Sequence, residues 1–109
     1  MTDDQVRELI RIQSADNLRT TNDHRINLER ALVTPQRISV IARQVADGRL
    51  KDHVLNVWLV GREHSSDGYK IIMRDDGLQF GLASSGFPND KDPILAGWYG
   101  SLLSAFLSM

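Results

Sequence analysis

The hydrophobic pattern near the start of the chain is helical. Within residues 2–13, Val6, Leu9 and Ile10 recur at helical spacing, and acidic residues precede them where they favour the positive end of a helix dipole. Residues 14–32 are more polar until the helical period returns at their end. Either one long helix or two helices fit this pattern, and we favour two.

A second helix-like pattern covers residues 35–47. Thr34 can cap a helix, Pro35 suits its first position, and Gly48 suits the left-handed conformation that ends many helices. Apolar residues lie on one face of this predicted helix, at Ile38, Ile41, Ala42 and Val45. The sequence therefore predicts helices over about residues 3–47.

From residue 53 the composition becomes typical of strands. Three strands are predicted between about residues 53 and 84, joined as an antiparallel meander by a turn within residues 63–68 and a second turn at Asp76-Gly77. If Asp76 and Gly77 are the two loop residues, Met73 lies opposite Phe80, and the apolar residues of both strands share one face.

The last stretch, residues 93–108, reads as a helix rich in apolar and small residues. Asp92 can cap it and Pro93 can occupy its first turn. The predicted fold is thus a single α+β domain over residues 1–109, with N-terminal helices, a three-stranded antiparallel meander and a C-terminal helix packed on the sheet. Small residues along that helix would allow close approach to another backbone.

Composition narrows the class of protein. The chain has 109 residues, of which 41% are hydrophobic and 25% charged, which is typical of a folded soluble domain. A net charge of −1 argues against nucleic acid as the main partner. The absence of cysteine excludes disulfides and fits a cytoplasmic protein, and the apolar stretch at the end is too short to span a membrane.

Candidate chemistry is sparse. The sequence contains no nucleophile motif, metal-ligand spacing or phosphate-binding loop, so we expect no catalytic residues, no metal and no cofactor. Polar residues near the predicted hairpins could bind an anionic small molecule or serve an enzyme, and these are Arg62, His64, Tyr69 and Arg74. Whether the protein is an enzyme stays open, with a non-enzymatic role favoured.

The function predicted from these observations is a small protein-interaction module, such as an adaptor, a chaperone-like protein or an immunity-like protein. Its partner would be another protein or a second copy of the chain. The expected interface lies on the terminal helix, at Trp98, Tyr99, Ser101 and Ser104. The alternatives are the anionic-ligand binder or enzyme described above, and a DNA-binding regulator acting through the helix at 35–47. No stretch of the sequence resembles a known family.

Overall fold

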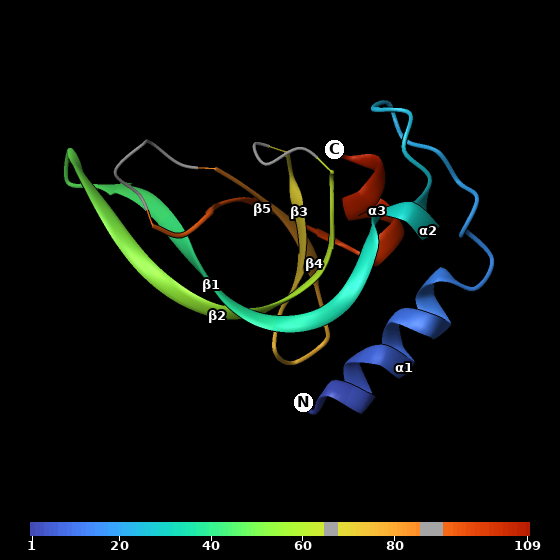
Figure 1. Cartoon of the computed structure of the whole chain (residues 1–109). Coiled ribbons are helices and arrows are strands. Elements are labelled where there is room, and N and C mark those ends of the chain that lie inside the picture. The colour runs from blue at the N-terminus through green and yellow to red at the C-terminus, as the bar shows by residue number, and fades with distance from the viewer. Residues whose placement is uncertain (65–67, 86–90) are drawn as a thin grey trace.

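The structure, a computed structural model, consists mostly of strands and describes residues 1–64, 68–85 and 91–109. Five strands close into a barrel in the order β1-β2-β3-β4-β5, with β5 returning to pair in parallel with β1 (Figure 1). The elements in chain order are α1 (Asp3–Ser14), α2 (Leu28–Ala31), β1 (Leu32–Ala46), β2 (Arg49–Arg62), β3 (Lys70–Met73), β4 (Phe80–Ser84), β5 (Ile94–Gly100) and α3 (Leu102–Leu107). The predicted three-stranded meander with a packed terminal helix is therefore wrong.

The largest correction concerns the predicted helix at 35–47, which is the strand β1. Its apolar residues fit a period of two as well as a helical one, so that Ile38 and Val40 share one face while Ile41 shares the other face with Val45. β1 pairs with β2 along almost its whole length, and this pairing selects the strand over the helix. Pro35 falls within a register shift between β1 and β2, where its missing amide removes no ladder hydrogen bond.

The turn between β1 and β2 explains Gly48 differently from a helix stop. Asp47 has φ 53° and Gly48 has φ 73°, and the residues on either side of them face each other across the hairpin. Two consecutive positive φ angles are the signature of a type I′ hairpin turn, for which Asp-Gly is a preferred sequence. This dipeptide is therefore a hairpin signal that the helical reading overlooked.

The C-terminal stretch is a strand followed by a short helix, not one helix from residue 93. Gly100 has φ 87°, which breaks regular structure between β5 and α3. Ser101 then caps α3, because its hydroxyl accepts a hydrogen bond from the backbone N–H of Ser104 at 3.1 Å. The stripe of small residues predicted along one helix is consequently divided between two elements.

Two local predictions are confirmed. The first helix forms as α1, and Thr2 caps it in a reciprocal capping box. The β3–β4 pairing has the predicted register, with Met73 opposite Phe80, and Gly77 has φ 75°. The loop between them is longer than predicted, since Arg74 N–H bonds to the Gln79 carbonyl and four residues lie between. The other predicted turn, within residues 63–68, lies partly outside the described residues.

The sheet carries a hydrophobic cluster on each face. The larger cluster joins the sheet to the helices, and its members include Val6, Ile10, Leu28, Trp58, Val60, Ile71, Met73, Phe80, Leu82, Leu102 and Phe106. The smaller one contains Val40, Val57, Ile72 and Ala83, with Ile38, Leu55, Leu95 and Trp98 packed against it. Because the helices cover only one end of the sheet, the far half of the β1–β2 hairpin projects beyond them (Figure 1).

Candidate functional site

The projecting half of the β1–β2 hairpin has an open edge. β3 pairs with β2 only from Trp58 onward, so residues 50–57 of β2 have no strand beside their outer edge among the described parts of the chain. The molecule measures 44 × 30 × 21 Å, and the hairpin forms one end of its long dimension (Figure 1). An uncovered edge exposes backbone hydrogen-bonding groups that can pair with another strand.

The direction of these backbone groups follows from one hydrogen bond. Ile41 N–H donates to the Pro93 carbonyl at 2.8 Å, so the backbone groups of Ile41 point toward β5 and away from β2. Val54 lies opposite Ile41 and therefore also points its N–H and C=O away from the β1–β2 ladder. The same alternation applies to Asp52 and Leu50, whose backbone groups consequently face the open edge.

The side chains of these three residues lie on one face of the hairpin. Val54 and Leu50 are each 65% exposed, and Val45, which lies opposite Leu50, is 74% exposed. Isolated exposed apolar residues are ordinary, but here three of them share one face of a two-stranded ribbon. We call residues 50–54 of β2 together with Val45 the hairpin edge.

An ion pair sits between the two apolar positions of the hairpin edge. Arg43 donates to Asp52 through two nitrogen atoms, at 2.8 Å and 3.0 Å. The hydrogen bond from Arg43 is the main cause that lowers the pKa of Asp52 below its usual value. Asp52 is thus engaged within its own hairpin by a bidentate partner, and the charge on the edge is locally balanced.

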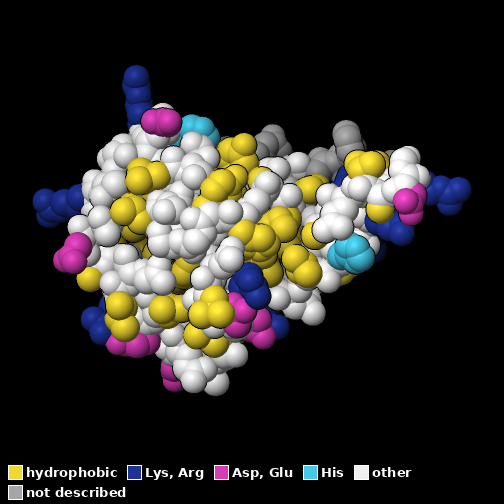
Figure 2. All heavy atoms as spheres, turned by 180° about the vertical axis from the view of Figure 1, so that it is seen from behind, with side chains coloured by type: hydrophobic (Ala, Val, Ile, Leu, Met, Phe, Trp, Pro, Cys, Tyr) yellow, Lys and Arg dark blue, Asp and Glu magenta, His cyan; other side chains and the backbone are white. Residues whose placement is uncertain are grey.

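A groove of about 560 Å³ opens beside the inner end of this edge. Its lining comes from β2, the β3–β4 turn and β5, and consists of Leu55, Asn56, Val57, Arg74, Asp75, Asp76 and Trp98. Apolar side chains from the smaller hydrophobic cluster form part of this lining, and each of its two carboxylates is paired with a guanidinium, Asp75 with Arg37 at 2.6 Å and Asp76 with Arg74 at 2.8 Å. In the space-filling view from behind, the hairpin is a narrow projection with apolar side chains leading toward it and charged side chains at its end (Figure 2).

Asp75 fixes the β3–β4 turn that forms one wall of the groove. Its Oδ1 accepts hydrogen bonds from Trp58 Nε1 at 3.0 Å and from Arg37 Nη1 at 2.6 Å, and the amino group of Met1 lies 3.8 Å away. The Arg37 guanidinium also lies 5.2 Å from the centre of the Trp58 ring. The Trp58 hydrogen bond, followed by that from Arg37, lowers the pKa of Asp75 below its usual value.

This pKa shift predicts a pH dependence of stability. Because the pKa of Asp75 is lower in the folded state than in the unfolded state, ionised Asp75 stabilises the fold above the unfolded pKa, and this contribution is lost as the pH falls through the folded pKa. The parent protein should therefore lose more unfolding free energy between neutral and strongly acidic pH than Asp75→Asn does. Urea unfolding at several pH values measures this difference, and parallel curves for the two proteins would contradict it.

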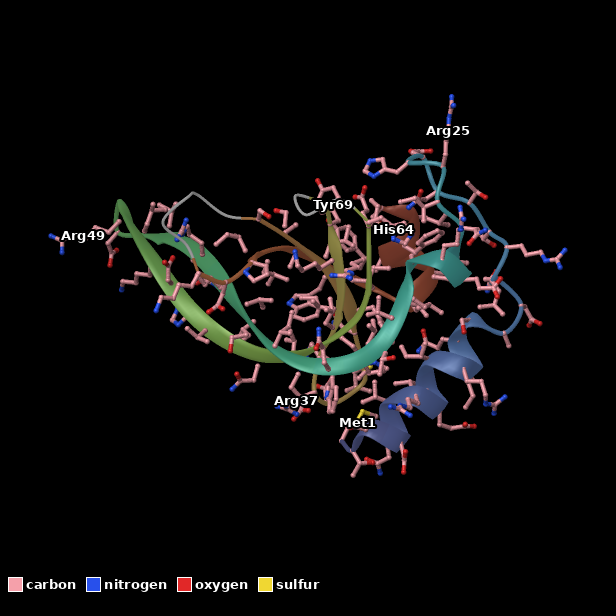
Figure 3. The ribbon with its side chains drawn as sticks, viewed as in Figure 1. Met1, Arg25, Arg37, Arg49, His64 and Tyr69 are labelled. Carbon is pink, nitrogen blue, oxygen red and sulfur yellow. The ribbon has the colours of Figure 1, made fainter. Side chains whose placement is uncertain are left out.

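The four residues predicted to bind an anionic ligand are placed at two ends of β3. Arg62 pairs with Lys70 at the start of the strand, beside His64 and Tyr69, whereas Arg74 follows the end of the strand at the groove. Figure 3 shows His64 and Tyr69 on the side opposite Arg37. The structure thus brings the first three together without Arg74, and their ligand-binding role stays a prediction.

Near those residues, Tyr69 contacts two residues that the sequence did not single out, Glu63 and His24. Glu63 Oε1 accepts a hydrogen bond from Tyr69 N–H at 3.1 Å and lies 3.0 Å from His24 Nδ1. The rings of His24 and Tyr69 are stacked with centroids 6.2 Å apart. These contacts tie the loop before α2 to the end of β2, which is a structural role.

The residues predicted as a partner interface lie on β5 and α3. Trp98 packs over Gly81 in the smaller cluster and borders the groove, while Tyr99 is 39% exposed. Ser101 caps α3, and the Ser104 side chain is exposed. Their interface role stays a prediction, but the helix that was to present them together does not exist.

Comparison of the chain with protein-family models, with curated proteins and with solved structures found no match. Within residues 1–64, 68–85 and 91–109, no three or more histidine or acidic side chains are grouped so that they could hold a metal ion. No helix in the described part of the chain is long and apolar enough to cross a membrane. The DNA-binding alternative has lost its basis, because the helix on which it depended is β1.

Proposed function

We propose that the protein is a non-enzymatic interaction module that binds an extended protein segment along the open edge of β2. The observation that carries this proposal is the outward direction of the backbone groups of Leu50, Asp52 and Val54. A segment that adds to this edge as a further strand satisfies those groups with main-chain hydrogen bonds. The exposed side chains of Leu50 and Val54 add apolar contacts on one face of the new strand pair.

The groove gives the edge a means of selecting its partner. It begins where the open edge approaches the β3–β4 turn, and Trp98 and Leu55 supply apolar surface for a side chain of the bound segment. Asn56 and the Arg74–Asp76 ion pair border the same space, so a long side chain with an apolar stem and a polar end suits it. Main-chain pairing thus provides general affinity, and the groove provides side-chain preference.

Site-specific photo-crosslinking in the native host tests this function. A photoreactive amino acid at position 54 should form protein adducts whose crosslinked residues, mapped by mass spectrometry, cluster in an extended segment. The matched control is position 12 on α1, since Ile12 is 59% exposed and lies outside the hairpin edge. Equal adduct formation at both positions, or none at position 54, would contradict the proposal.

A further inference from the structure

We infer that the segment bound at the hairpin edge is the same edge of a second copy of this chain, paired antiparallel about a two-fold axis through Asp52. The inference rests on the proposed function and names its partner. The two hairpins then form a continuous four-stranded ribbon, with the two barrels at opposite ends. The pairing is isologous, so each copy contributes the same surface.

The spacing of apolar residues along the edge makes it self-complementary. Leu50 and Val54 lie on either side of Asp52 at equal distances along the strand, so the two-fold axis sets Leu50 of one copy opposite Val54 of the other. Facing residues in an antiparallel pair share a face. Two apolar rows result, each running from Val45 through Leu50 to Val54 and Ile41 of the second copy.

Backbone geometry allows this register. Leu50, Asp52 and Val54 all direct their N–H and C=O groups outward, and an antiparallel hydrogen-bonded pair requires both facing residues to do so. The pairs Leu50 with Val54, Asp52 with Asp52, and Val54 with Leu50 meet that requirement. A register shifted by one residue would set outward groups opposite inward ones.

Charge along the row through Asp52 is balanced within each copy. The two Asp52 side chains face each other, and each is held from its other side by the bidentate hydrogen bonds of its own Arg43. Across the four strands, this row therefore consists of Arg43 and Asp52 of one copy followed by Asp52 and Arg43 of the second copy. These four side chains together have no net charge. The whole chain carries a net charge of only −1, so long-range repulsion between two copies is small.

The same register also places a side chain of the second copy in the groove. In this register Arg49 of the second copy, which precedes Asp52 by three residues, lies opposite Leu55, which follows Asp52 by three residues. The Leu55 side chain borders the groove. The groove thus receives the arginine at the tip of the second hairpin, with its apolar stem against Trp98 and its guanidinium at the polar border of the groove. Figure 3 shows Arg49 extending outward from the tip of the hairpin.

The oligomeric state of the purified full chain tests the inference first. Sedimentation equilibrium across a wide concentration range should give twice the monomer mass of 12.3 kDa at high concentration. Val54→Lys places a charge in both apolar rows and should weaken the dimer at least about tenfold. Ile12→Lys, on exposed α1 surface, is the matched control and should dimerise like the parent.

The register is tested with single cysteines, since the chain has none of its own. Asp52→Cys should form an intermolecular disulfide on mild oxidation, because residue 52 alone faces its own copy at a Cα separation of about 5.5 Å. His53→Cys and Val54→Cys would face themselves only in shifted registers, and they should crosslink much less. Preferential crosslinking at 53 or 54 would overturn the register.

The outcomes separate this inference from the proposed function. A monomer at every concentration, or a dimer that Val54→Lys leaves unchanged, would overturn the inference. If the purified chain is monomeric while position 54 crosslinks to a different protein in the host, the proposed function stands and the partner named here is wrong. A dimer sensitive to Val54→Lys, with crosslinking at position 52, supports both.

Discussion

Replacing Phe106 with alanine is expected to lower the free energy of unfolding by about 3–5 kcal/mol. Phe106 is fully buried on α3, within the larger hydrophobic cluster that joins the helices to the sheet. Its backbone carbonyl also accepts a hydrogen bond from the buried side chain of Asn22 at 3.3 Å. Because α1, α3 and the sheet all meet in this cluster, a cavity here weakens the contact between the helices and the barrel.

The neighbouring residue provides a matched control for this prediction. Leu107 lies on the same helix but is 45% exposed, so Leu107→Ala should change the free energy of unfolding by about 0.5 kcal/mol or less. Chemical denaturation measures both changes. The comparison is direct when the free energy of unfolding falls with denaturant concentration at the same slope in both variants. Similar losses for both variants would mean that α3 does not anchor to the barrel through Phe106.

Gly81→Ala is expected to lower the free energy of unfolding by about 1–3 kcal/mol, because the added methyl group overpacks the barrel. Gly81 lies on β4 opposite Trp98 of β5. A Cβ atom there would meet the backbone oxygen of Gly97 and would lie 2.7 Å from Trp98 Cε3. The backbone oxygen cannot move away without disturbing the β4–β5 pairing. The substitution should therefore weaken the pairing that helps to close the barrel.

Gly97→Ala is the matched control on the adjacent strand. The nearest atoms to a Cβ at Gly97 belong to the Tyr99 side chain, with the hydroxyl oxygen at 3.2 Å, and that side chain is partly exposed and can move. Its replacement should therefore cost less than that of Gly81. Thermal unfolding compares the two variants. An equal or larger loss of stability for Gly97→Ala would mean that the close approach of β4 and β5 does not depend on the absence of a side chain at Gly81.

The parts of the fold that sequence could predict are those fixed by local interactions. α1 has a capping box at Thr2 and one apolar face, and both signals lie within a few residues of each other. The β3–β4 register follows from the turn at Gly77 and from the requirement that apolar residues share a face. In both cases no distant segment was needed to decide the structure.

The wrong predictions concern segments whose structure depends on distant partners. Residues 35–47 satisfy the spacing of a helix and of a strand equally well, and pairing with β2 selects the strand. The type I′ turn at Asp47-Gly48 was readable from the sequence, but Gly48 also suits the end of a helix, and the helical pattern before it favoured that reading. Near the C-terminus, β5 forms because β4 and β1 provide neighbours on both sides.

The candidate site was less predictable than the fold. Groove residues come from β2, the β3–β4 turn and β5, and sequence analysis selected only Arg74 and Trp98 among them. The open edge is a property of tertiary structure, because it exists where β3 ends and β2 continues. Once β1 and β2 are recognised as one long hairpin, the exposed apolar positions at Leu50 and Val54 become the available sequence signal.

The central claim is that the outward backbone groups of β2 pair with a second copy of the chain, and amide hydrogen exchange measures this directly. The amides of Leu50, Asp52 and Val54 should exchange rapidly in dilute protein and slowly in concentrated protein. Those of Lys51 and His53 point toward β1 and should be protected at both concentrations, which provides an internal control. Equally rapid exchange of the three outward amides at every concentration would contradict the claim.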